Sequence, residues 1–178
     1  MSKVKAVKYG LLSLSASLLL AGCNGEDEPT ETSPSEEETA GIQGIELPVP
    51  LNNAIDLFYE TFESEDISID SIQFEEDDGR YIYAFDGWDG EFAYELKVDA
   101  ETSEVFDQEQ EEDSETEDEL NLEDIIDPIE AMDAALEASG SGYVEEWELE
   151  VENDQTIYDI DVEDGDDQQI DAVSGQAM

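Results

Sequence analysis

The fold is decided by the stretch Phe92-Ala93-Tyr94-Glu95-Leu96-Lys97-Val98-Asp99-Ala100-Glu101-Thr102. Large apolar side chains occupy every second position from Phe92 to Val98, which is the period of a β-strand with one buried face. The residues from Asp99 then turn the chain. A related ending, Ile170-Asp171-Ala172-Val173-Ser174-Gly175, stands close to the C-terminus. The sequence therefore predicts the same strand end and turn at two places.

A similar series of elements precedes each of the two endings. Helical spacing begins at Ala54-Ile55-Asp56, where an Asn of the preceding Asn52-Asn53 pair is the expected N-cap, and runs to about Ser64. It begins again at Ala131-Met132-Asp133, after Asp127 as N-cap and Pro128 in the first turn. Alternating apolar residues predict strands over 67–74, 81–85 and 92–98 in the first series, and over 143–151, 157–162 and from 170 in the second.

The predicted fold class is α+β, with two repeats of a helix packed on a small antiparallel sheet after a disordered N-terminal tether. The helix Ala and the turn Asp are 45 residues apart in one series and 40 in the other, and such repetition indicates one unit used twice. The predicted repeats are residues 47–106 and 122–178, joined by an acidic linker at 107–121. Each repeat has about 55 residues, a marginal size for a core of its own, so we expect the two to pack together or to remain weakly stable.

The N-terminal 22 residues have the pattern of a signal peptide. Lys3, Lys5 and Lys8 precede an apolar stretch at 11–20, which is too short for a membrane span of about 20 apolar residues. The following Leu20-Ala21-Gly22-Cys23 resembles the bacterial lipobox, which implies that Cys23 is lipidated and becomes the first residue of the mature chain. Cys23 is the single cysteine and has no internal disulfide partner. Residues 23–46 are predicted to be a disordered acidic tether.

The net charge is extreme. The chain has 53 acidic and 5 basic residues, and the predicted mature part keeps all the acids but only Arg80 and Lys97, a formal charge of −51 before termini. This charge excludes nucleic acid as a partner, because phosphate binding needs a basic surface. Two explanations stay open. One is halophilic adaptation, in which salt screens the self-repulsion. The other is a special use of the acids in binding cations or a basic partner.

The sequence offers no catalytic or metal-binding pattern. It contains no histidine, which removes the usual zinc ligands and the Ser-His-Asp triad. Acidic turns at 86–90 and 161–166 do not have the spacing of a calcium loop. A glycosidase carboxylate pair cannot be recognised among so many acids, for which a solvated surface is the better explanation. We therefore predict no catalytic residues, no cofactor, no metal site and no enzymatic activity.

The two series resemble the PepSY domain, a family of peptidase propeptides and bacterial envelope proteins. The resemblance is carried by the Ala-bearing helices, by Tyr94 and Tyr158 in the strands, and by the closing turns at Asp99-Ala100 and Asp171-Ala172. The first copy departs from the family at Ser103, where Gly is usual. The second departs at Gln168-Gln169, which replace apolar residues, so its last strand is expected to be short or frayed.

The motif residues have expected structural roles. Asp99 and Asp171 should fix turns by side-chain-to-backbone hydrogen bonds, and Ala100 and Ala172 should allow close packing under a helix. The aromatic rows are expected in the core or in cross-strand pairs. Trp88, in a predicted hairpin tip, and Trp147 are candidate anchors for a partner.

Two functions follow as hypotheses. By resemblance, the protein is an envelope lipoprotein whose PepSY-like modules bind, inhibit or regulate an envelope or secreted peptidase. The alternative is an acidic structural or cation-associating surface lipoprotein without a specific protein target. Asn24 after the cysteine favours, by resemblance, the outer membrane or periplasmic face of a Gram-negative cell. In a cell that is not Gram-negative, we expect the protein to be anchored at the outer face of the cell membrane.

Overall fold

The strand predicted from Phe92 is β3 of the sheet. A computed structural model describes residues 41–45, 48–64, 66–113 and 115–178. The predicted signal peptide, Cys23 and nearly all of the tether lie outside the described residues. The elements, in chain order, are η1 (Ile42–Gly44), α1 (Leu51–Phe62), β1 (Ser68–Asp77), β2 (Arg80–Trp88), β3 (Phe92–Asp99), β4 (Val105–Glu112), α2 (Pro128–Ser139), β5 (Tyr143–Glu152), β6 (Gln155–Glu163) and β7 (Gln168–Asp171).

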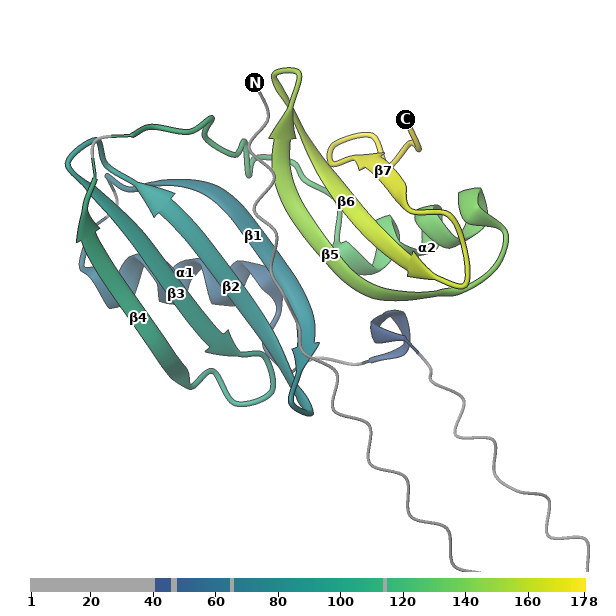
Figure 1. The fold of residues 1–178 in the computed structure, drawn as a ribbon, viewed down its shortest axis with the longest axis horizontal. Helices are drawn as coiled ribbons and strands as arrows, with labels where there is room; N and C mark the ends of the chain where they lie inside the picture. The colour runs from purple at the N-terminus through teal and green to yellow at the C-terminus, as the bar shows by residue number, and fades with distance from the viewer. Residues whose placement is uncertain (1–40, 46–47, 65, 114) are drawn as a thin grey trace, which may run out of the picture. The chain divides into compact units, whose positions relative to one another are not determined.

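The seven strands form one antiparallel sheet in the order β4-β3-β2-β1-β5-β6-β7. The two series of strands are joined where β1 pairs with β5, in a register that runs from Ile72 opposite Leu149 to Glu75 opposite Glu146. Both α1 and α2 lie on the same side of this sheet (Figure 1). The α+β class and the antiparallel pairing are therefore as expected, and the strands of both series share one sheet.

The core lies between the sheet and the helices. Buried residues largely alternate with less buried ones along β1, β2, β3, β5 and β6. Phe58 of α1 brings its ring to 5.4 Å from that of Phe85 on β2. Gly87 allows this approach, because a Cβ there would lie 2.8 Å from the Ser68 carbonyl oxygen and 3.1 Å from the Phe58 ring. The second helix packs on β5, β6 and β7. The inward side chains from both series belong to one cluster of buried residues, so the two series share a core.

The helix ends show one wrong prediction and one confirmed one. The first helix begins at Leu51 with Pro50 as N-cap and no side-chain cap, so the expected Asn cap is wrong. Pro50 fixes its own φ near the value that a chain entering a helix needs. The second helix is capped as predicted, because Asp127 Oδ1 accepts the backbone N–H of Ile129 at 2.9 Å.

The start of the predicted acidic linker is corrected by the structure. Residues 107–112 continue β4 along the whole of β3, from Asp107 opposite Lys97 to Glu112 opposite Phe92. A like-charged stretch suggests disorder when it stands alone, but here the neighbouring strand supplies hydrogen-bond partners for its backbone. The described residues between Asp113 and Asp127 contain neither helix nor strand. The last strand, β7, is short, as expected from Gln168-Gln169.

Candidate functional site: two Asp-Ala turns and an acidic sheet face

The first Asp-Ala turn ties the end of β3 to the start of α1. Asp99 Oδ1 accepts the backbone N–H groups of Glu101 (3.0 Å) and Thr102 (2.8 Å) and the Thr102 hydroxyl (2.8 Å). These bonds, led by the one from the Thr102 side chain, hold the pKa of Asp99 below its ordinary value. Ala100 is fully buried, and its carbonyl accepts the N–H of Val49 at 3.2 Å. The turn therefore anchors the segment that leads into α1.

The second Asp-Ala turn has the same connections. Asp171 Oδ1 accepts the N–H of Ser174 at 2.6 Å, and the interaction with Ser174 lowers the pKa of Asp171. Ala172 is fully buried, and its carbonyl accepts the N–H of Ile126, just before α2, at 2.8 Å. The predicted turn-fixing roles of Asp99 and Asp171 are thus confirmed, and Ala100 and Ala172 are buried.

A buried tyrosine completes each connection. The Tyr83 hydroxyl donates to the Val49 carbonyl at 3.1 Å, and the Tyr158 hydroxyl donates to the Ile126 carbonyl at 2.8 Å. Burial is the main cause that raises the pKa of both phenols, so both remain protonated donors. The alternation of apolar residues in the sequence placed both tyrosines in strands. Only the tertiary structure shows that their hydroxyl groups reach the segments before the helices.

The sheet face opposite the helices is crowded with carboxylates. On β5 they are Glu146 and Glu148, and on β6 the residues directly opposite are Asp161 and Asp159. Glu75 of β1 lies opposite Glu146 across the β1–β5 pair. Like charges opposite each other on one face of a sheet repel, so this face is electrostatically strained. The Gln73 amide offsets part of this repulsion by donating a hydrogen bond to Glu146 Oε1 at 2.7 Å.

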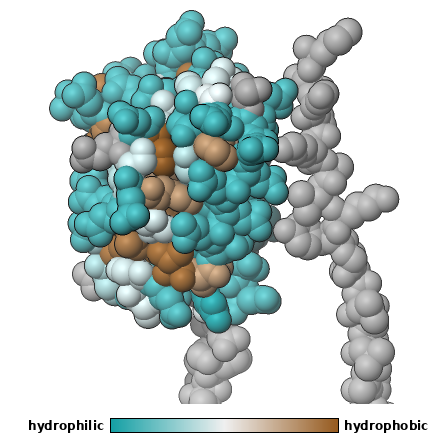
Figure 2. All heavy atoms as spheres, turned by 90° about the vertical axis from the view of Figure 1, so that its left-hand side faces the viewer, coloured by the Kyte–Doolittle hydropathy of each residue, from teal (hydrophilic) through white to brown (hydrophobic). Residues whose placement is uncertain are grey.

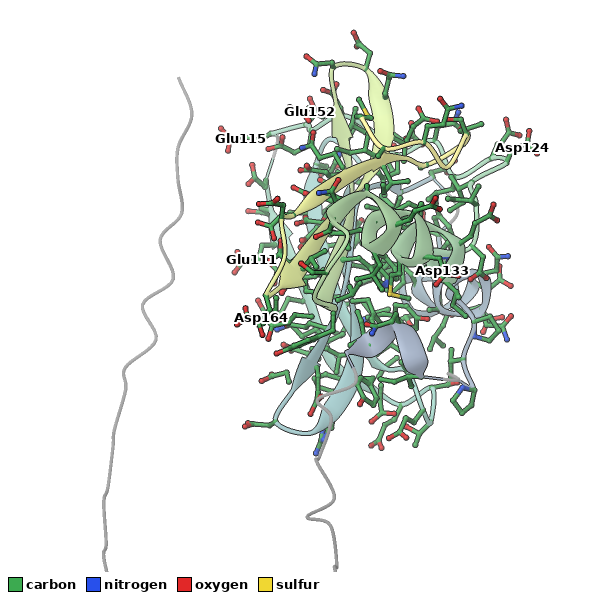
Figure 3. All side chains as sticks on the ribbon, turned by 90° about the vertical axis from the view of Figure 1, so that its right-hand side faces the viewer. Glu111, Glu115, Asp124, Asp133, Glu152 and Asp164 are labelled. Carbon is green, nitrogen blue, oxygen red and sulfur yellow. The ribbon has the colours of Figure 1, made fainter. Side chains whose placement is uncertain are left out.

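The crowding changes the acidity of this face. Burial, followed by the charges of Glu150 and Glu146, raises the pKa of Glu148 to about 7. Burial, followed by the charge of Asp86, raises the pKa of Asp70 to about 6. Such groups bind protons near neutral pH, and they would also gain from bound cations. Acidic side chains project from strands, loops and α2 elsewhere on the molecule too, among them Glu111, Asp133 and Asp164 (Figure 3).

The two tryptophans lie in different environments, and neither is freely exposed. Trp147 is 2% exposed and stacks on Phe74 with 5.7 Å between ring centroids and 17° between planes. Its proposed role as a surface anchor is therefore corrected: the ring faces the helices and stabilises the β1–β5 pair. Trp88 lies at the end of β2 rather than in a hairpin tip and is half-buried. Its indole N–H is enclosed without an acceptor among the described residues.

The acidic turn at 86–90 uses its carboxylate for local structure. Asp89 Oδ1 accepts the N–H groups of Glu91 and Phe92, and Asp89 Oδ2 accepts the Tyr94 hydroxyl at 2.7 Å. Within the described part of the chain, no group of three or more acidic, cysteine or histidine side chains is arranged to hold a metal ion. None of the helices described there is long and apolar enough to cross a membrane.

Comparison with known proteins finds a family match that includes the second Asp-Ala turn. Residues 125–178 match the family model of the peptidase propeptide and YPEB domain, PepSY. The matched segment contains α2, β5, β6, β7 and the Asp171-Ala172 turn, so the C-terminal part of the chain is similar to PepSY domains. No curated protein gives a significant match.

One solved structure extends the likeness beyond that segment. It is the crystal structure of a candidate lipoprotein from Clostridium difficile 630, which is 29% identical in sequence and superposes with a TM-score of 0.72. The alignment covers 78% of this chain and 95% of that chain. Because this share is much larger than residues 125–178, the likeness also includes strands of the first series.

Proposed function

We propose that the protein is an envelope lipoprotein whose two PepSY-like modules bind a peptidase and inhibit or regulate it. The observation that carries this proposal is the PepSY match at residues 125–178, a family described by its peptidase propeptides. The match and the likeness to a candidate lipoprotein favour a non-catalytic role in the envelope. The proposal goes further than these comparisons in one respect: it states that the protein binds a peptidase and inhibits it.

The proposal assigns a second module to residues 47–106. Its support is the recurrence of the same bonds in both series: an Asp-capped turn, a buried Ala that accepts from the pre-helix segment, and a Tyr hydroxyl that donates to it. Each first strand also carries a register shift near its start, between Ile69 and Ser71 in β1 and between Val144 and Glu146 in β5. Unrelated segments would have no reason to share these connections.

Lipid anchoring at Cys23 is the second part of the proposal. It is supported by the lipobox-like Leu20-Ala21-Gly22-Cys23 and by the likeness to a candidate lipoprotein. The anchor would hold the modules at the outer membrane or periplasmic face of a Gram-negative cell, or at the outer face of another cell's membrane. Replacing Cys23 by Ser should release the protein from the membrane fraction. Cys23→Ser protein that remains in the pellet after a salt wash would disprove the anchor.

The peptidase hypothesis is tested with inhibition assays. The mature chain with Cys23→Ser is added to each peptidase secreted by the same cells, and bound peptidase is recovered at high salt, where diffuse attraction to an acidic protein is screened. We expect one peptidase to be bound and slowed. Trp88→Ala should weaken that binding, because Trp88 is the remaining candidate anchor for a partner. Val173→Ala, which shortens an exposed side chain elsewhere, is the control and should leave binding unchanged.

A specific observation also favours the alternative function, a cation-associating acidic lipoprotein without a protein target. The carboxylates that face each other on β1, β5 and β6 would be stabilised by any cation that collects over them. If no peptidase is bound or slowed at micromolar protein, the binding-module proposal fails and this alternative replaces it.

A further inference from the structure

We propose that the free edge of β4 is a docking site for an extended, lysine- or arginine-bearing segment of a partner protein, which adds to the sheet as a further strand. This inference rests on the proposed binding role, and it names the surface and the chemistry of the partner segment.

The backbone of β4 has an unused side. The strand ends the sheet and pairs only with β3 among the described residues. Asp113 donates its backbone N–H to the Glu91 carbonyl at 3.1 Å, which marks a hydrogen-bonded position at the end of the β3–β4 pair. Such positions alternate along an antiparallel ladder, so Gln108, Gln110 and Glu112 direct their N–H and C=O groups away from β3. A further strand could bond to these groups without disturbing the sheet.

The charge on β4 selects the partner. Every residue of β4 after Val105 is exposed, and Asp107, Glu109, Glu111 and Glu112 are acidic. In Figure 2, which faces this side of the molecule, most of the surface is hydrophilic, with apolar patches between. Acidic side chains keep the edge from pairing with another copy of this acidic chain. The same charges attract a strand that carries lysine or arginine, and they speed its encounter.

An exposed aromatic side chain lies near the start of β4. Phe106 is the extra residue at the register shift between Lys97 and Val98, and it is 41% exposed. The Arg80 guanidinium carbon lies 5.8 Å from the centre of its ring. An exposed aromatic ring at the start of an open edge gives an incoming strand an apolar contact in addition to the backbone bonds.

The opposite edge of the sheet offers much less. Its strand, β7, has only four residues. On its outer side Ile170 is already bridged to Ala177, and the Met178 N–H bonds to the Gln169 carbonyl at 2.9 Å. Within the described residues, β4 is therefore the longer edge and the one open to a new strand.

The test compares two substitutions at one outward-facing position of the full mature chain. Gln110→Pro removes an N–H that points away from β3, a position where an edge strand tolerates proline. Gln110→Thr changes the same side chain but keeps the N–H, and it is the matched control. The probe is a short peptide in which lysine and valine alternate, measured by calorimetry at about 0.15 M salt, where the Debye length is about 8 Å. A second form of the peptide, with every internal backbone nitrogen methylated, keeps every charge but has no internal N–H to donate along either of its edges.

We expect the peptide to bind the Thr variant as it binds the wild type and to bind the Pro variant about fivefold more weakly. The methylated peptide should bind weakly to all three, with no further loss in the Pro variant. Equal binding of both peptides to the wild type would mean diffuse electrostatic attraction and would overturn the proposal, as would no binding at all. The methylated arm decides the matter even if the Pro variant fails to fold. If a peptidase binds the Gln110→Pro variant as tightly as it binds the wild type, the proposed peptidase-binding function is retained. Only the proposal that β4 is the docking site is then rejected.

Discussion

We predict that removing the charge of Glu148 stabilises the protein, whereas most substitutions lower the free energy of unfolding. Glu148 lies on the face opposite the helices, between Gln73 of β1 and Asp159 of β6. Burial first, and then the charges of Glu150 and Glu146, raise its pKa from 4.5 to about 7. The folded state therefore binds this proton more tightly than the unfolded chain does. The stability contributed by the protonated group is fully present below about pH 4.5 and is lost as the pH rises through about 7.

The size of the effect follows from the two pKa values. A difference of about 2.5, at about 1.36 kcal/mol for each pKa unit, gives a ceiling of ~3.4 kcal/mol. Glu148 is only partly buried, so solvent screening reduces the expected gain for Glu148→Gln at pH 8 to about 1–2 kcal/mol. For a folded part of this size, such a gain raises the melting temperature by about 3–8 °C.

The assay is thermal unfolding of the wild type, Glu148→Gln and Glu104→Gln, each at pH 8 and pH 5. Glu104 is exposed, so its substitution removes the same formal charge from a solvated position and should change stability by about 0.5 kcal/mol or less. We expect a clear gain for Glu148→Gln at pH 8 that has largely disappeared at pH 5. Equal effects of the two substitutions at pH 8, or a gain that does not depend on pH, would refute the crowded-carboxylate argument.

Three further predictions concern stability. Raising NaCl from about 0.1 to 1 M should raise the melting temperature, because the Debye length falls from about 10 to 3 Å and the carboxylates repel less; a flat curve would remove the main support for halophilic adaptation. Tyr83→Phe and Tyr158→Phe should each cost about 1 kcal/mol in denaturant unfolding, since each loses one hydrogen bond to a pre-helix carbonyl; clearly unequal costs would contradict equivalent roles. Trp147→Ala should cost about 3–5 kcal/mol because the ring is buried; a cost below 1 kcal/mol would mean that the β1–β5 pair does not depend on it.

Local patterns in the sequence predicted the elements whose causes are local. The alternation that begins at Phe92 marks β3, Asp127 before Pro128 caps α2, and Asp99 and Asp171 close their own turns. Each of these depends on neighbours within a few residues along the chain, so a single sequence contains the information. The N-cap of α1 was predicted wrongly because a proline, and not one of the nearby asparagines, occupies that position.

Contacts between distant residues account for what the sequence did not show. The acidic residues 107–112 resembled a linker, and they are a strand because β3 lies beside them. Trp147 resembled a possible surface anchor, and it is buried because β5 pairs with β1, which brings Phe74 to its ring. The raised pKa values of carboxyl groups such as Asp70 and Glu148 depend on burial and on charges from other parts of the chain.

The sequence alone determined a strongly acidic α+β chain with a lipobox-like start and two similar series of a helix and strands. Composition and short-range periodicity are sufficient for those conclusions, because they depend on the order of residues within each element. Only the tertiary structure decided that the strands of both series form one sheet and that carboxylates face each other across β1, β5 and β6. It also decided that β4 ends the sheet, with no strand of the described residues on its outer side. Strand pairing joins residues far apart in the chain, and its register is set by the packing of the whole sheet rather than by any one segment.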